Sequence, residues 1–312
     1  MAKAELVYVG TADGLIVLSD PGGIGRWRQV DHAWIGHAIT ALLARSARDV
    51  LVAGAGIGVQ HTTDGGQHWQ PLLATAVIAL TGHPATPTML YAITAEGVGQ
   101  RSQDSGHTWE AVPVPATADG ACCLLVLPHD PQRLFVAANA TVWRSTDAGG
   151  AWVQHGAPLP AAITSLVTSP VADGDLLAVA EGAIYQQSSA DLPAASTVWH
   201  ALDLAVGGPG YQVALAVLAG TPTVLLAGFS SRDSLLFARR EAREAPYWQM
   251  ARATVPLQGA IQVITPVSHH MDRAWAGTEG GQLLRTDDRG RTWKLVAQVA
   301  APVQSLAITR LI

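Results

Sequence analysis

Short apolar runs of strand-favouring residues alternate with Gly-, Pro- and Asp-containing turns along almost the whole chain. One period begins with a first run such as CLLVLPHD, which is followed by a turn and then by a second run such as LFVAANA. A third run then leads into another turn, and a Trp opens the fourth. Almost none of the runs shows the roughly 3.6-residue spacing of an amphipathic helix. The pattern therefore predicts short antiparallel strands in groups of four.

One tryptophan marks each copy of this pattern. The members of the series are separated by 42, 40, 43, 47, 49 and 45 residues, and they are Trp27, Trp69, Trp109, Trp152, Trp199, Trp248 and Trp293. A four-stranded unit that recurs every roughly 40–50 residues is typical of a β-propeller blade. The sequence therefore predicts an all-β protein, a single seven-bladed β-propeller with four-stranded antiparallel blades.

The two ends of the chain share one predicted blade. Residues 5–20 match the second and third strands of a period, and the missing first strand reappears as PVQSLAIT at 302–309. We expect this C-terminal strand to complete the first blade, which removes an exposed strand edge. The predicted blades are 302–312 with 5–30, 37–73, 76–114, 120–157, 161–204, 211–253 and 260–297.

Four periods carry the same turn, Ser/Thr-x-Asp-x-Gly-x-x-Trp, between the third and fourth strands. The carboxylate can accept hydrogen bonds from backbone N–H groups, and the Gly supplies a backbone angle that other residues resist. The Trp is expected to pack between adjacent blades. The residues in these roles are Asp64, Gly66 and Trp69, Asp104, Gly106 and Trp109, Asp147, Gly149 and Trp152, and Asp288, Gly290 and Trp293. A calcium loop is the alternative, but each copy holds too few carboxylates for about six to eight oxygen ligands.

This repeated turn resembles the Asp-box, or BNR repeat, of the sialidase-like propeller superfamily. The resemblance extends over the chain at blade level, although the first, fifth and sixth periods have lost the box. The seventh period, AWAGTEGGQLLRTDDRGRTW, is most similar to BNR propellers related to photosystem II assembly factors and to bacterial BNR-repeat proteins. The superfamily includes sialidases, xyloglucanases, sortilin-type receptors and assembly chaperones, so the resemblance implies a fold and leaves the function open.

The composition of the chain disfavours some classes of partner. The net charge is −5 and no basic run is present, which disfavours nucleic acid. No apolar stretch reaches about 18 residues, so no membrane span is expected. No secretory signal is visible at the start, and the adjacent Cys122 and Cys123 are interpreted as buried thiols in a reducing compartment, with a vicinal disulfide as the alternative. We expect a cytoplasmic protein.

Catalytic groups do not converge in the predicted fold. A sialidase needs three arginines around one carboxylate, a Tyr–Glu pair and a separate acid. Arg101, Arg144 and Arg285 occupy equivalent positions in different blades, so they cannot meet at one substrate. The histidines of the turns between first and second strands have no metal-ligand spacing, and they are His83, His129, His269 and His270. No cofactor and no metal are expected.

Two surfaces are candidates for binding. Acidic residues occupy the turns between second and third strands and would form one charged rim at a channel mouth, and they are Asp13, Glu96, Glu181, Asp233 and Glu279. The sixth period has ARREAREAP in place of a tight turn, with Arg239, Arg240 and Arg243 as a candidate docking hairpin. Ordinary turn chemistry and a solvated hairpin are the alternatives.

These features favour a non-catalytic propeller that acts as a protein-binding scaffold, an assembly factor or a subunit of a complex. The alternative is a glycan-binding or glycoside-hydrolysing propeller with its site at the channel mouth.

Overall fold

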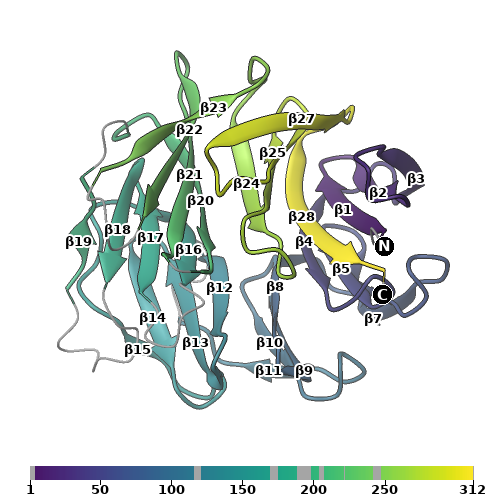
Figure 1. The fold of residues 1–312 in the computed structure, drawn as a ribbon. Coiled ribbons are helices and arrows are strands. Elements are labelled where there is room, and N and C mark those ends of the chain that lie inside the picture. The colour runs from purple at the N-terminus through teal and green to yellow at the C-terminus, as the bar shows by residue number, and fades with distance from the viewer. Residues whose placement is uncertain are drawn as a thin grey trace. The chain divides into compact units, whose positions relative to one another are not determined.

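The computed structural model describes residues 4–115, 121–168, 175–187, 198–203, 207–220, 222–241 and 247–311. The regular secondary structure in these ranges consists of β-strands alone, which are numbered β1 to β28 (Figure 1). The strands group into two compact units, the first made of Met1–Ala76 with Ala214–Ile312 and the second of Val77–Val213. In the described ranges, no helix has the length and apolar character needed to cross a membrane.

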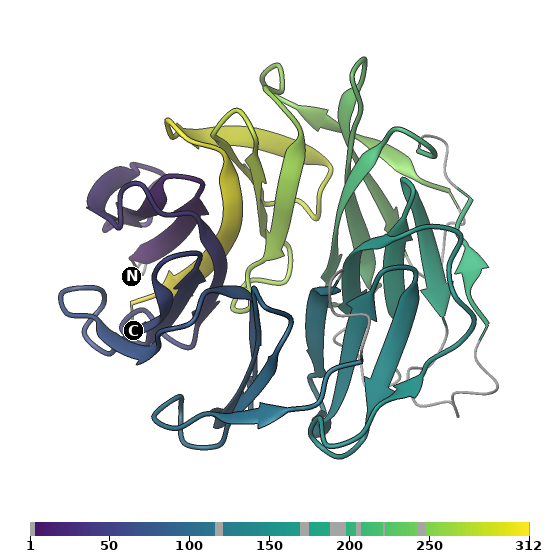
Figure 2. The same cartoon turned by 180° about the vertical axis from the view of Figure 1, so that it is seen from behind.

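The first sheet of the first unit joins the two ends of the described chain. Its strand order is β28-β1-β2-β3, and every neighbouring pair is antiparallel. The strands are β1 (Glu5–Thr11), β2 (Gly14–Asp20), β3 (Arg28–Ala33) and β28 (Val303–Arg310). The yellow C-terminal strand lies beside the purple β1 in both views (Figures 1 and 2). The C-terminal strand thus completes the first sheet, as the sequence predicted.

The first unit contains two more sheets. One has the order β4-β5-β6-β7, and the other has eight strands in the order β20-β21-β22-β23-β27-β26-β25-β24. The eight-stranded sheet consists of two four-stranded groups joined by a short parallel pairing of β23 with β27. The strands are β4 (Ile39–Ala44), β5 (Val50–Gly54), β6 (Gly58–Thr62), β7 (Gln70–Leu73), β20 (Gln212–Leu218), β21 (Val224–Ser230), β22 (Leu235–Glu241), β23 (Gln249–Ala253), β24 (Ile261–Pro266), β25 (Ala274–Thr278), β26 (Gln282–Thr286) and β27 (Thr292–Gln298).

The second unit has three four-stranded antiparallel sheets, β8 to β11, β12 to β15 and β16 to β19, each in chain order. Their strands are β8 (Val77–His83), β9 (Thr86–Thr94), β10 (Gly99–Ser102), β11 (Glu110–Val112), β12 (Ala121–Leu127), β13 (Asp130–Ala138), β14 (Thr141–Ser145), β15 (Val153–Gln154), β16 (Ile163–Thr168), β17 (Leu176–Ala180), β18 (Ala183–Gln187) and β19 (His200–Ala201). Cys122 and Cys123 both lie on β12.

Burial explains why the second strand of each group has a continuous apolar sequence. Every residue of β5, β17 and β25 is buried, whereas every residue of the short fourth strands β15 and β19 is exposed. A strand covered on both faces gains from apolar residues at every position, so its sequence does not alternate. The fourth strands lie at the solvent edge and can be polar.

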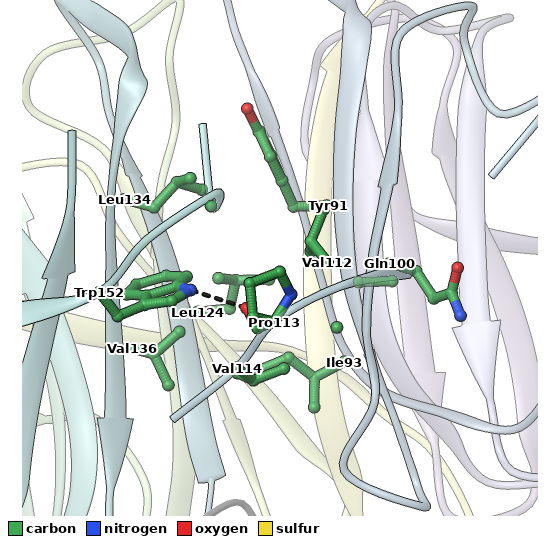
Figure 3. A pocket seen from close by; sticks show the side chains of 13 residues that line it. Tyr91, Ile93, Gln100, Val112, Pro113, Val114, Leu124, Leu134, Val136 and Trp152 are labelled. Carbon is green, nitrogen blue, oxygen red and sulfur yellow. Dashed lines mark hydrogen bonds between the residues drawn. The ribbon is translucent and has the colours of Figure 1, made fainter. Parts of the chain in front are cut away.

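The Trp of the repeated turn fills the space between neighbouring sheets. Trp293 is 1% exposed and stacks on Phe237 of the preceding four-stranded group in the eight-stranded sheet, with ring centroids 4.3 Å apart. In the second unit, Trp152 donates from its indole N–H to the Pro113 carbonyl at 2.7 Å (Figure 3). The cavity beside Trp152 has only about 10 Å³, room for one water at most. These sheets pack through the tryptophans, with little empty space.

His155 is a buried titratable group of the second unit. It is 0% exposed, and its ring lies edge-on to Phe135 at 5.1 Å. Burial lowers the pKa of His155 to about 4, and the nearby Arg144 and Arg133 add to the shift. Between pH about 4 and pH about 6.5, this imidazole is therefore neutral in the folded protein but protonated in the unfolded chain.

We expect acid to weaken the fold through His155. Because the folded pKa is depressed, the contribution is fully present above pH about 6.5 and is lost as the pH falls toward 4, at a cost of about 2–3 kcal/mol. His155→Phe should flatten that part of the stability–pH curve, measured by urea unfolding at pH 7 and pH 4.5. An identical loss in both proteins would show that other groups control the acid response.

Candidate functional site

The four repeated turns have one hydrogen-bond pattern. In each, the Ser or Thr hydroxyl donates to the Asp Oδ1 at 2.8 Å. The same hydroxyl oxygen accepts from the Gly N–H at 2.8–2.9 Å. The Asp Oδ1 also accepts from the N–H four residues later, at 2.8–3.0 Å. The motif residues therefore bind one another within the turn.

These donors stabilise the ionised carboxylates. The Thr108 N–H and hydroxyl, with the Ser102 hydroxyl, lower the pKa of Asp104 to about 2. The pKa values of Asp64 and Asp147 are also lowered, chiefly by backbone N–H donors. At Asp288, burial opposes the shift, but the hydrogen bonds from Thr292 and Thr286 outweigh it and the pKa is lowered. Each carboxylate is thus engaged by its own turn.

Replacing Asp288 with Ala should destabilise the fold by about 1–2 kcal/mol, because the Thr292 and Thr286 donors lose their acceptor. Asp233→Ala, which removes an exposed carboxylate of the same unit that has no hydrogen bond or ion pair with a described residue, is the matched control. Urea unfolding at neutral pH measures both. A loss for the control as large as that for Asp288→Ala would argue against a special role for the motif.

The glycines of the turns adopt the predicted left-handed backbone, with φ between 81° and 99° at Gly66, Gly106, Gly149 and Gly290. Gly290 also approaches the other four-stranded group of its sheet closely. A Cβ placed there would lie 2.3 Å from Leu226 Cδ2, so any side chain at this position would require Leu226 to move.

The predicted acidic rim residues all lie exposed in turns between the second and third strands of their sheets. Asp13 Oδ1 accepts from the Gly36 N–H at 2.7 Å, and Glu279 Oε2 accepts from the Ala260 N–H at 3.3 Å. Asp13, Asp233 and Glu279 belong to the first unit, whereas Glu96 and Glu181 belong to the second. Of these five residues, Asp13 and Glu279 therefore have a local structural role.

The prediction that Arg239 belongs to an exposed docking hairpin is wrong. Arg239 is 2% exposed, donates to Gln249 Oε1 at 2.7 Å and pairs with Glu241. The reason is that β22 continues to Glu241, which keeps Arg239 inside the packed sheet. Arg240 is half-buried on the same strand, and Arg243 lies outside the described residues. Arg239 therefore acts within the fold and is unavailable to a partner.

The three repeat-equivalent arginines lie on different sheets. Arg101 donates to the Ala148 carbonyl of the next sheet at 3.0 Å, whereas Arg285 binds Asp287 at 3.0 Å. Arg144 lies on β14 of the second unit. Among the described residues, no group of three or more His, Cys, Asp or Glu side chains is arranged to hold a metal ion.

A charged cavity of about 550 Å³ lies in the first unit, between the first sheet and the turn that connects β24 to β25. We call it the arginine pocket. It is lined by Glu5, Asp20, Gly23, Ile24, Gly25, His269, His270, Arg273, Arg285 and Arg310. In the first sheet it lies at the opposite strand ends from Asp13, because Glu5, Asp20 and Arg310 are cross-strand partners there.

Ion pairs fix two of the three guanidinium groups. Arg273 donates to Glu5 Oε1 at 2.5 Å and to Asp287 Oδ1 at 2.6 Å. Arg285 binds the other oxygen of Asp287 at 3.0 Å and lies over the Trp275 ring at 5.9 Å. Arg310 makes no ion pair or side-chain hydrogen bond with a described residue. The cavity thus combines two oriented arginines with one uncompensated arginine.

Sequence reasoning missed this pocket because its residues come from three distant segments. His269 and His270 were interpreted as turn residues, and Arg285 as one of three repeat-equivalent arginines. The available signal was the closing strand, since pairing 302–309 with the first strand places Arg310 opposite Glu5. Cross-strand register is thus what brings the basic and acidic groups together.

Four-stranded antiparallel sheets that pack through tryptophans define a fold of the β-propeller class. Among solved structures, YCF48 bound to a D1 peptide gives a TM-score of 0.64 at 14% identity, covering 100% of this chain and 97% of that chain. A GH74 enzyme of Niastella koreensis gives a TM-score of 0.67 at 13% identity, covering 94% of this chain and 52% of that chain. At such identities the likeness concerns the fold alone.

The comparison with curated sequences gives a short match. Vacuolar protein sorting/targeting protein 10 of Mycosarcoma maydis is 38% identical over 76 residues, which cover 24% of this chain and 5% of that protein. The chain thus matches a small part of that relative's length. No protein-family model matches the chain.

Proposed function

We propose that the chain is a non-catalytic, seven-bladed Asp-box propeller of the sialidase-like type that binds another protein. Its role is that of a scaffold, an assembly factor or a subunit of a larger complex. Support for the blade count comes from the seven antiparallel groups of four strands among the described residues. Support for protein binding comes from the likeness to YCF48, which covers the whole chain and whose structure contains a bound D1 peptide.

One observation carries the non-catalytic part of the proposal: the carboxylates of the motif and of the arginine pocket are already engaged within the fold. Asp20 accepts from the Ile24 and Gly25 N–H groups, and Glu5 accepts from Arg273 and His269. Glycoside hydrolysis needs two carboxyl groups placed to serve as acid and as base or nucleophile. The four Asp-box carboxylates have lowered pKa values, which disfavours the acid role at these positions.

A glycan-binding or glycoside-hydrolysing propeller with its site at the channel mouth is the second candidate. The likeness to the GH74 enzyme favours it, although this chain corresponds to about half of that one. The exposed acidic turn residues would then contact a sugar and not a protein.

Cross-linking of the tagged chain in its native cells, followed by mass spectrometry, tests the proposal. We expect a protein partner in a near-stoichiometric ratio with reproducible cross-links, and no binding on a glycan array. Changing Glu96, Glu181 and Glu279 together to Gln tests the acidic turns, because a contact through them should weaken with this change and with rising salt. Glycan binding or xyloglucan cleavage without a stoichiometric protein would favour the second candidate.

A further inference from the structure

The arginine pocket has an excess of unused hydrogen-bond donors. Most of its acceptors are occupied, since Glu5 Oε1 accepts from Arg273 at 2.5 Å and from His269 at 3.3 Å, and only Glu5 Oε2 has no described donor. Asp20 is 2% exposed and takes the N–H groups of Ile24 at 3.2 Å and Gly25 at 2.6 Å. A ligand that brings hydrogen-bond donors finds few free partners in this cavity.

Donors remain on three separate segments. Arg310 at the end of β28 has all of its N–H groups free of described partners. Arg285 uses Nε and Nη2 on Asp287, and Arg273 uses Nε and Nη1 on Asp287 and Glu5, which leaves one terminal nitrogen on each. The His270 side chain makes no described hydrogen bond. The unused N–H groups therefore belong to lining residues of three separate segments.

The position of Arg310 also favours an anionic ligand. Arg273 and Arg285 are paired with Glu5 and Asp287, and the backbone N–H groups of Ile24 and Gly25 stabilise Asp20. Among the described residues, Arg310 is the pocket arginine without an ion-pair partner. An anion that enters the cavity supplies that partner and the missing acceptors together.

We propose that the arginine pocket binds the phosphate group of a small organic phosphate monoester. The donors come from β26, β28 and the turn after β24, and donors on three segments can contact more of the oxygens of a tetrahedral phosphate than the two oxygens of a planar carboxylate offer. Arg273 and Arg285 are held by ion pairs and by Trp275, so little side-chain entropy is lost on binding.

The size of the cavity indicates an organic phosphate. About 550 Å³ lies within the range of small-molecule sites and exceeds what the phosphate group alone fills. Ile24 is 67% exposed and lines the cavity, where it offers an apolar contact to the organic part. This site is separate from the proposed protein-binding role and does not depend on it.

Isothermal titration calorimetry of the full chain with glucose 6-phosphate, inorganic phosphate, citrate and glucose tests the proposal. We expect binding of both phosphates, tighter for the ester, and none of glucose. Arg310→Gln should weaken phosphate binding by about tenfold or more. Arg252→Gln, an exposed arginine of β23 that does not line the pocket, is the matched control and should bind as the wild type does.

Thermal melting of each variant shows whether it is folded, and His270→Gln gives a second, milder change in the pocket. Failure of the folded wild type to bind either phosphate at millimolar concentration would overturn the proposal. So would a preference for citrate, or phosphate binding that both Arg310→Gln and His270→Gln leave unchanged.

Discussion

Removing β28 by ending the chain after Pro302 should destabilise the protein by about 5 kcal/mol or more. Val303, Leu306 and Ile308 are buried against Val7 and Val9 of β1, and burial of each such side chain contributes about 1.5–3 kcal/mol. The deletion also leaves the backbone groups of β1 unpaired along one edge. Since domains are stable by only about 5–15 kcal/mol, the truncated chain should be largely unfolded at 37 °C.

Circular dichroism and thermal melting measure this effect, with Leu306→Ala as a partial version that should cost about 2–4 kcal/mol. A synthetic peptide of residues 303–311 should restore the melting transition of the truncated chain, because the strand is held by non-covalent pairing. Melting of the truncated chain within a degree or two of the full chain would refute the role given to β28.

Trp293→Ala should cost about 3–5 kcal/mol, the second largest expected effect. The side chain is 1% exposed and stacks on Phe237, so its removal leaves a large cavity between two sheets. Trp293→Phe keeps an aromatic ring in contact with Phe237 and should lose much less. Urea unfolding separates the two variants, and an alanine effect under about 1 kcal/mol would mean that the sheets do not depend on this contact.

The sequence predicted the strands and the C-terminal pairing well because both depend on local patterns and on a repeated period. The inward position of Trp293 followed from its apolar surface, and the geometry of the Asp288 turn followed from the chemistry of a short carboxylate. These features depend on residues within one period or on the alignment of one period with the next.

Prediction was poorer where segments far apart in the chain meet. Arg239 looked like part of a solvated charge run, but the continuation of β22 buries it against Gln249 and Glu241. The arginine pocket depends on the register of β28 with β1 and on the turn near Arg273, which lies 30 residues before the start of β28. Charge composition alone could not reveal that Arg310 would have no ion-pair partner among the described residues.

We infer that the repeated turns build the fold and do not bind ligands. The most direct measurement is the affinity of Asp104→Ala for the partner found by cross-linking, at a temperature where variant and wild type are both folded. We predict an unchanged Kd together with a lowered melting temperature, because Asp104 is engaged by Thr108 and Ser102 within its own turn. Lost binding with an unchanged melting curve would contradict the claim.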